Sequence, residues 1–268
     1  MKQERQKMDQ VMKKSVLFVL LLGLSCNGTW PVPVDRNDLT MEFTRIYDSI
    51  YLAHEQNYWP VNALIYTDSN GIIFFDSGWT YKSGRQLVWQ AATLNQLDYL
   101  AVVPTSWHLN RSGGLSVFRA SRVPILMQRK TPLLLDSKWK NAQESMKSSF
   151  SSWPVLSFES TQRIFGSKFS FQKQGIDLYH LKNGISADNV LVHFTKEKAI
   201  YAGGLFTIPI RFQDRKNPTD LLGTLDFIET LDFNSIIDGQ QARVHSRQWL
   251  IKWREYIQSL SDVENGPS

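Results

Sequence analysis

The residues best placed to do chemistry lie in one short stretch, residues 105–114, which reads Thr-Ser-Trp-His-Leu-Asn-Arg-Ser-Gly-Gly. Ser106, His108 and Asn110 alternate along it, so their side chains would project from one side if strand geometry continued this far. An apolar run precedes the stretch, and the Gly-Gly pair leads into an expected helix. This is the frame of a metal-binding loop. A hydrolytic metal site, however, needs imidazoles and carboxylates where this loop holds a hydroxyl, one imidazole and a carboxamide.

The elements around this stretch follow an α/β pattern. Alternation over residues 43–54 predicts a strand, and apolar runs at 61–67 and 72–76 predict two more. The last two are joined by Asp68-Ser69-Asn70-Gly71, whose Asn-Gly pair is a strong hairpin signal. Helical spacing over 80–94 and a short apolar run at 100–103 then predict a helix and a buried strand, which ends at the polar stretch.

The second half of the chain repeats this mixture of strands and helices. Thr131 as N-cap and Pro132 at the first position predict a helix that continues to about residue 150. A helix, a strand and a helix are expected near the end, at 220–231, 235–238 and 243–260. The strands expected between these helices, together with one before residue 131, are 123–127, 155–158, 162–165, 169–171, 176–181, 190–195 and 199–202.

Charge excludes one class of partner. The net charge is +5, but the first 25 residues hold five basic and two acidic side chains, so the remainder carries 25 basic and 23 acidic residues. A nearly neutral body offers no clustered Lys and Arg for a phosphate backbone. We therefore expect no nucleic-acid partner.

The chain begins with a predicted export signal over residues 1–26. Met12-Lys13-Lys14 is basic, and the apolar run that follows is too short to span a bilayer. The only cysteine, Cys26, follows directly, which resembles a bacterial lipoprotein signal whose cysteine becomes acylated. An ordinary signal peptide with a chance cysteine is the alternative. The expected location is periplasmic, or anchored in a bacterial envelope by lipid. We expect a tether over 27–42, one domain over 43–262 and a disordered tail over 263–268.

Five segments, in order, resemble the metallo-β-lactamase superfamily, which implies an α/β fold of the αββα four-layer sandwich type. They are 61–65 (Val-Asn-Ala-Leu-Ile), 73–79 (Ile-Phe-Phe-Asp-Ser-Gly-Trp), 105–114, 184–189 (Gly-Ile-Ser-Ala-Asp-Asn) with 202–205 (Ala-Gly-Gly-Leu), and 237–240 (Ile-Asp-Gly-Gln). The family's first loop reads T-H-x-H-x-D-x-x-G-G and binds one or two zinc ions. The resemblance therefore identifies which positions of this chain would hold zinc.

Only one of the six ligand positions implied by the resemblance keeps its ligand, His108. The other five hold Ser106, Asn110, Ile185, Leu205 and Gln240. Catalytic zinc needs three protein ligands and an open position for water. A carboxamide oxygen is a poor zinc ligand, and hydrocarbon beside the site would leave the charge uncompensated. We expect no zinc or other cofactor. A shifted metal site using His108 and His180 stays open as an alternative.

The resemblance implies an exported pseudoenzyme that binds a small-molecule or peptide-like ligand, or a partner, in the former active-site groove. Residues expected near that groove are Asp76, Trp79, Trp107, Asp188 and Asn189, with Trp59 at its rim. One alternative is a hydrolase of a β-lactam, ester or thioester with an atypical metal site that would hold zinc. Another is a Ser106–His108 pair oriented by Asp76 or Asp188, set against polar residues that only cap a helix. His54 and His193 are expected at the surface or at an interface.

Overall fold

The computed structural model describes residues 41–56, 59–94, 97–146, 162–206 and 218–264, all within one compact unit, Val32–Ser268. The predicted signal and almost all of the predicted tether lie outside the described residues, as does the predicted strand 155–158. The described elements run from Met41 to Glu264, two residues beyond each predicted domain boundary, 43 and 262.

The first sheet has seven strands that follow one another in chain order. β1 to β4 pair antiparallel, and β4 to β7 pair parallel. Its strands are β1 (Met41–Arg45), β2 (Ile50–Glu55), β3 (Val61–Asp68), β4 (Gly71–Phe75), β5 (Tyr99–Val103), β6 (Ile125–Gln128) and β7 (Gln162–Phe165). The predicted Asn-Gly hairpin is confirmed between β3 and β4, where Asp68 Oδ1 accepts a hydrogen bond from the Asn70 backbone N–H.

The second sheet has six strands in the order β13-β12-β11-β10-β9-β8. All neighbours pair antiparallel except β11 and β12, which are parallel. Its strands are β8 (Lys168–Phe171), β9 (Ile176–His180), β10 (Val190–Phe194), β11 (Ala199–Tyr201), β12 (Ser235–Ile237) and β13 (Val244–Ser246).

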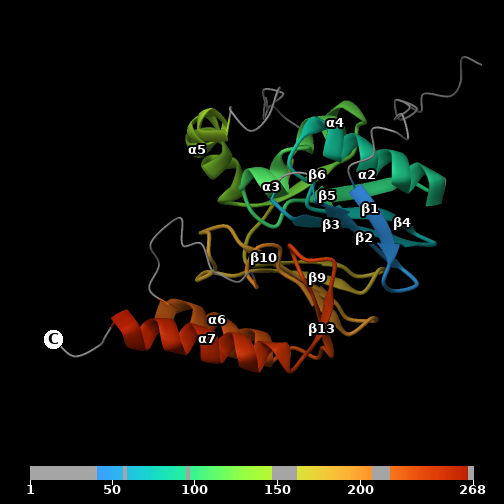
Figure 1. Cartoon of the computed structure of the whole chain (residues 1–268). Coiled ribbons are helices and arrows are strands. Elements are labelled where there is room, and N and C mark those ends of the chain that lie inside the picture. Colours follow the sequence, from blue (N-terminus) through green and yellow to red (C-terminus); the bar gives the residue numbers. More distant parts are fainter. Residues whose placement is uncertain (1–40, 57–58, 95–96, 147–161, 207–217, 265–268) are drawn as a thin grey trace, which may run out of the picture. The chain divides into compact units, whose positions relative to one another are not determined.

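Alternating side chains place the two sheets face to face between layers of helices (Figure 1). In β4, Ile72 and Phe74 pack towards the helices, while Ile73 and Phe75 belong to the apolar cluster between the sheets. A third cluster joins the second sheet to the last two helices. The first helical layer holds α2 (Tyr81–Leu94), α3 (Leu109–Ser112), α4 (Leu115–Ala120) and α5 (Thr131–Met146), and the other holds α6 (Pro218–Glu229) and α7 (Trp249–Glu264).

Two predicted elements are wrong, one near each end of the domain. The single strand expected over 43–54 is a hairpin, because the chain turns after β1 and Ile46 N–H bonds back to the Ile50 carbonyl. The helix expected to begin at Arg243 is preceded by strand β13, which pairs with β12. α7 itself begins at Trp249. Short polar runs such as Val-His-Ser carry little periodicity, so pairing with a neighbouring strand decides their conformation.

Candidate functional site

The polar loop after β5 brings Ser106 and His108 together. Ser106 Oγ lies 3.0 Å from His108 Nδ1, and the imidazole stacks on the Trp107 ring with centroids 4.6 Å apart. Ser112 Oγ donates to the carbonyls of Trp107 and His108 at 2.8 and 2.9 Å. The loop is thus closed on itself by local hydrogen bonds at the start of α3.

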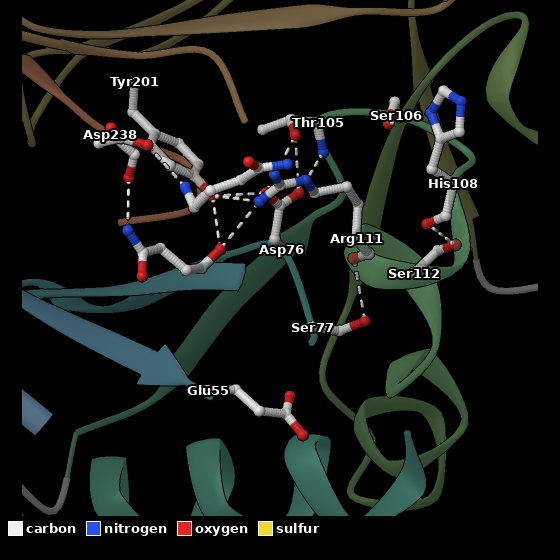
Figure 2. Close-up of polar contacts among 12 residues, drawn as sticks. Glu55, Asp76, Ser77, Thr105, Ser106, His108, Arg111, Ser112, Tyr201 and Asp238 are labelled. Atoms are coloured by element: carbon white, nitrogen blue, oxygen red, sulfur yellow. Dashed lines mark hydrogen bonds and ion pairs between the residues drawn. The ribbon is translucent and has the colours of Figure 1, made fainter. Parts of the chain in front are cut away.

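A different group, Arg111, anchors this loop to the interior. Its carbonyl accepts hydrogen bonds from the backbone N–H and the hydroxyl of Ser77, at 2.8 and 3.0 Å. Its side chain is 1% exposed and extends to the fully buried carboxylate of Asp76, with Nη1 3.2 Å from Oδ2. In Figure 2 the guanidinium points towards Asp76 and Tyr201, while the His108 imidazole points away from it. The neighbours Asp76 and Ser77 therefore hold both ends of Arg111.

Asp76 is the centre of a buried network that crosses between the two sheets. Its backbone is left-handed, with φ 63°, a conformation that Asp tolerates better than most residues. Oδ1 accepts from the backbone N–H of Thr105 at 2.7 Å and from its hydroxyl at 2.8 Å. Oδ2 accepts from the Tyr201 hydroxyl at 2.6 Å, so strands β4 and β11 are joined through one carboxylate. Burial raises the pKa of Asp76, while Arg111, Tyr201 and Thr105 oppose that rise.

Asn62 of β3 extends the network to the turn after β12. Its carbonyl lies 3.0 Å from Arg111 Nη1 and 2.8 Å from the Tyr201 hydroxyl. Its Nδ2 donates to the carbonyls of Asp238 and Gln241, at 2.7 and 2.6 Å. Asp238 Oδ1 accepts from the backbone N–H groups of the two residues that follow Gly239, which fixes the turn. Asn62 thus ties the turn that presents Gln240 to the first sheet.

Solved structures with the same arrangement of elements identify the fold. A metallo-β-lactamase from Pontibacter korlensis is 18% identical with a TM-score of 0.63, and the match covers 81% of this chain and 99% of that one. A metallo-β-lactamase from Erythrobacter litoralis, with β-mercaptoethanol in its active site, is 13% identical with a TM-score of 0.64, over 82% and 97%. For the DIM-1 metallo-β-lactamase the values are 15%, 0.63, 83% and 99%. This chain has the metallo-β-lactamase fold.

The predicted αββα architecture is confirmed, and likeness at these identities shows the fold alone. No sequence model of a known protein family matches the chain. Within the metallo-β-lactamase fold, the polar loop after β5 and the turns at Ile185, Leu205 and Gln240 are the parts of this chain that the resemblance implies would hold zinc.

The residues at these positions do not fit zinc. Leu205 is fully buried in the apolar cluster of α6 and α7, and Ile185 packs against the same cluster. Ile185 also approaches the turn itself, since its Cδ1 would lie 3.1 Å from a Cβ built on Gly204. Among the residues that the structure describes, no group of three or more His, Cys, Asp or Glu side chains could hold an ion. Zinc needs at least three such ligands.

Both carboxylates considered as partners for His108 are bonded to other groups. Asp76 is occupied by Thr105, Tyr201 and Arg111, and Asp188 Oδ1 accepts from the Ser186 hydroxyl. Burial raises the pKa of Asp188, and the Ser186 hydroxyl partly offsets this rise. The structure therefore brings Ser106 and His108 together. Asp76 is bonded at both oxygens to interior groups, whereas Asp188 is bonded through Oδ1 and its buried Oδ2 has no hydrogen-bond partner among the described residues.

The five residues predicted to lie near a groove are all buried. Trp79 and Trp107 are each 6% exposed and belong to the cluster between the first sheet and its helices. Asp76, Asp188 and Asn189 are 0%, 0% and 1% exposed. Asn189 shapes its own loop, since Oδ1 accepts from the Ser186 backbone N–H at 2.7 Å. Trp59 is half exposed and packs against Trp79 with the rings tilted by 56°, so it is the one aromatic of the expected rim that is largely exposed to solvent.

The remaining histidines serve the framework. The expectation that His54 and His193 lie at the surface is wrong: both are buried, with His54 Nδ1 2.6 Å from Asn62 Oδ1 and His193 Nε2 2.9 Å from the Asp232 carbonyl. His180 Nε2 lies 2.9 Å from the Ala187 carbonyl, so this nitrogen is engaged by the backbone of the neighbouring loop.

Two glycines of the loop are required by close backbone approach. A Cβ on Gly113 would lie 1.8 Å from the Trp79 carbonyl oxygen, and one on Gly114 would lie 2.3 Å from the Ser77 carbonyl oxygen. Gly84 of α2 fits against Gly114 in the same way, with its Cβ position 2.6 Å from the Gly114 carbonyl oxygen. The Gly-Gly pair therefore seats the loop against α2 and the turn after β4.

Proposed function

We propose that this protein is a pseudoenzyme: an exported protein of metallo-β-lactamase fold that does not perform zinc hydrolysis and binds a small ligand or a partner at the former ligand positions. The observation that carries the proposal is the pairing of a fully buried Leu205 with Ile185 at two of the positions that would hold zinc. Hydrocarbon at these points removes ligands and leaves a cation without compensating charge. The neutral side chains of Ser106, Asn110 and Gln240 add no thiolate, imidazole or carboxylate.

The chemical consequence concerns the nucleophile. Zinc lowers the pKa of its bound water from 15.7 to about 7, which supplies hydroxide at neutral pH. A site with His108 as its single family ligand cannot hold the ion in the open, three-ligand geometry that this chemistry needs. Hydrolysis by the family's route would therefore lack its attacking group.

Metal analysis and substrate turnover test the proposal directly. We expect the purified full chain, supplied with zinc, to retain no stoichiometric metal and to leave nitrocefin intact. The double variant Asn110→Asp with Ile185→His restores two ligands beside His108 and is the matched comparison, because it should gain zinc. One or two equivalents of zinc in the unmodified protein, together with nitrocefin turnover, would instead support the alternative, a hydrolase of a β-lactam, ester or thioester with an atypical metal site.

A second candidate function is acyl transfer through Ser106, favoured by the 3.0 Å contact between its Oγ and His108 Nδ1. A serine nucleophile needs a base that is itself oriented, yet both oxygens of Asp76 are bonded to interior groups and Asp188 Oδ1 is bonded to Ser186. Ser106 is also only 3% exposed. We expect a fluorophosphonate probe to leave the native protein unlabelled. Labelling that disappears in Ser106→Ala would establish the second candidate.

We further propose that the protein is exported and acylated at Cys26, so that lipid anchors it to a bacterial envelope membrane. This part of the chain lies outside the described residues, and the proposal is supported by the basic, apolar and cysteine pattern at residues 12–26. Within the described residues, no helix has the length and apolar character needed to cross a membrane. Labelling with a radioactive fatty acid should mark the wild type and not Cys26→Ser. Equal labelling of the two would reject acylation at this residue.

A further inference from the structure

The guanidinium of Arg111 has one nitrogen that the interior does not satisfy. Nη1 lies within 3.2 Å of Asp76 Oδ2, the Asn62 carbonyl and the Tyr201 hydroxyl. Nη2 is buried and has no hydrogen-bond acceptor among the described residues, although the side chain as a whole is 1% exposed. A buried donor without an acceptor is costly, and the cost is greater for a charged group.

The unsatisfied nitrogen faces the turns that would hold zinc in the metallo-β-lactamase fold. Nη2 lies 3.1 Å from the Cβ position of Gly239 and 3.7 Å from that of Gly204. These glycines directly precede Gln240 and Leu205. The Gly203 carbonyl oxygen is 1.7 Å from the same Gly239 Cβ position, so the backbones of the two turns touch beside Nη2. Nη2 therefore points to the seam between the two turns, at the base of the former site.

The unsatisfied donor at this seam favours an acceptor. The nearby carboxylate of Asp238 is already engaged, because Oδ1 accepts from the backbone N–H groups of Gln240 and Gln241 and Oδ2 lies 3.0 Å from His245 Nε2. Asp76, the one carboxylate bonded to Arg111, already accepts hydrogen bonds at both oxygens from Thr105 and Tyr201. The former ligand positions nearby hold a carboxamide and hydrocarbon in place of carboxylate or thiolate. A guanidinium presents donors in a fork that suits carboxylate and phosphate oxygens.

We propose that the seam between Gly204 and Gly239 binds a small anion, an oxyanion or a carboxylate, through Arg111 Nη2. This rests on the proposed function, because it names the ligand class that the metal-free site takes. Gly204 and Ile185 are both half-buried, so the Gly204 side of the seam borders solvent, and Ile185 Cδ1 lies 3.1 Å from the Gly204 Cβ position. The site would thus take an anion beside the positions at which the resemblance implies a zinc cation.

One substitution covers Nη2 without altering Arg111. Gly204 is not left-handed, and a Cβ there would be 3.7 Å from Nη2, with only the movable Ile185 Cδ1 closer, at 3.1 Å. Gly204→Ala should therefore fold and place a methyl group between Nη2 and the ligand. Gly223→Ala is the matched control, because a Cβ at Gly223 has nothing within 4 Å.

The test uses the full chain with inorganic phosphate or acetate, at constant ionic strength and with EDTA present. Calorimetric titration should show binding to wild type and to Gly223→Ala, and binding at least about tenfold weaker to Gly204→Ala, because the charge-assisted hydrogen bond is lost. Ile185→Ala, which opens the approach, should bind at least as tightly as wild type. Preference for phosphate identifies an oxyanion site, and preference for acetate identifies a carboxylate site.

Three outcomes would overturn the anion site: no binding of either anion, equal binding by Gly204→Ala and wild type, or weaker binding by Ile185→Ala. Metal analysis of the same preparation separates this failure from failure of the proposed function. Anion binding that requires zinc and disappears with EDTA rejects both proposals. Absence of zinc together with absence of anion binding rejects the anion site alone.

Discussion

The buried polar network around Asp76, which we call the floor, differs in its side chains from the positions above it that would bind zinc. In the floor, Asp76, Arg111, Tyr201 and Asn62 form a continuous buried network with hydrogen bonds of 2.6 to 3.2 Å. Above it, the positions that would bind zinc hold neutral or apolar side chains, and one imidazole remains. The two regions are covalent neighbours, since Arg111 directly follows Asn110.

This difference shows which parts of the site depend on metal chemistry and which depend on folding. The floor joins β3 and β4 of the first sheet to β11 of the second through charges that are fully desolvated. Removing one member leaves the others unpaired in the interior, so each member constrains the rest. The positions above form no comparable charged network: Ser106 and His108 bond to each other, Asn110 is half-buried, and Leu205 packs in an apolar cluster.

The largest effect is expected from Asp76→Asn, which would break the floor. Asn tolerates the left-handed backbone, so the substitution removes the charge and leaves Arg111 as an unpaired buried cation. We expect a loss of about 3–5 kcal/mol in the free energy of unfolding, measured by urea denaturation.

Asn110→Ala is the matched control for the region above. Its side chain is half-buried and occupies a former ligand position, and we expect a loss below about 1 kcal/mol. Equal losses in the two variants would erase the contrast between floor and ligand positions.

Tyr201→Phe would sharpen the comparison by weakening the floor without removing a formal charge. The hydroxyl donates to Asp76 Oδ2 at 2.6 Å and accepts from Arg111 Nη1 at 3.2 Å. Its removal should cost about 1–3 kcal/mol, because buried polar groups lose a partner while packing is kept. A double-mutant cycle with Asp76→Asn measures the coupling, and strict additivity would show that the network does not act as a unit.

The smallest effect is a dependence on pH that comes from Glu55, outside the floor. This carboxylate is 1% exposed and accepts from Ser83 Oγ at 2.8 Å. Burial raises the pKa of Glu55 from the usual 4.5, opposed mainly by the Ser83 hydrogen bond. The native state therefore binds more protons than the unfolded state above pH 4.5, and stability falls as pH rises through the raised pKa.

Glu55→Gln should remove this slope. The difference in unfolding free energy, wild type minus variant, should decrease as pH rises from about 4.5 and then level off above the raised pKa. Urea denaturation of both proteins across this pH range measures it. A difference that grows with pH would show that the pKa of Glu55 is lowered in the native state.

Much of the fold follows from sequence because its central strands are continuous apolar runs bounded by turn residues. Residues 72–75 are all apolar, in keeping with a strand that packs on both faces, and Asn70-Gly71 gives the hairpin directly. β13 could not be predicted, since three residues of mixed polarity are set by pairing with β12. The turn between β1 and β2 was not predicted, because residues 43–54 were interpreted as one alternating strand.

From the sequence, only those residues of the candidate site that fall on the spacing of a known motif could be predicted. The spacing identifies His108 and the five replaced positions, and the structure adds Arg111, Tyr201 and Asn62. Nothing local marks these three, because their importance comes from contacts across 49 to 139 positions in the chain. The one available signal was an arginine directly after the alternating residues, in a loop between apolar elements, where a charge needs a buried partner.

Gly113 and Gly114, beside α3, are held by close backbone contacts that have nothing to do with metal binding. A methyl group at Gly113 would meet the Trp79 carbonyl oxygen at 1.8 Å, whether or not any ion is bound nearby. Backbone packing therefore requires the Gly-Gly pair independently of any metal. A Gly-Gly match in such a loop indicates the architecture, and the side chains before it decide whether an ion can bind.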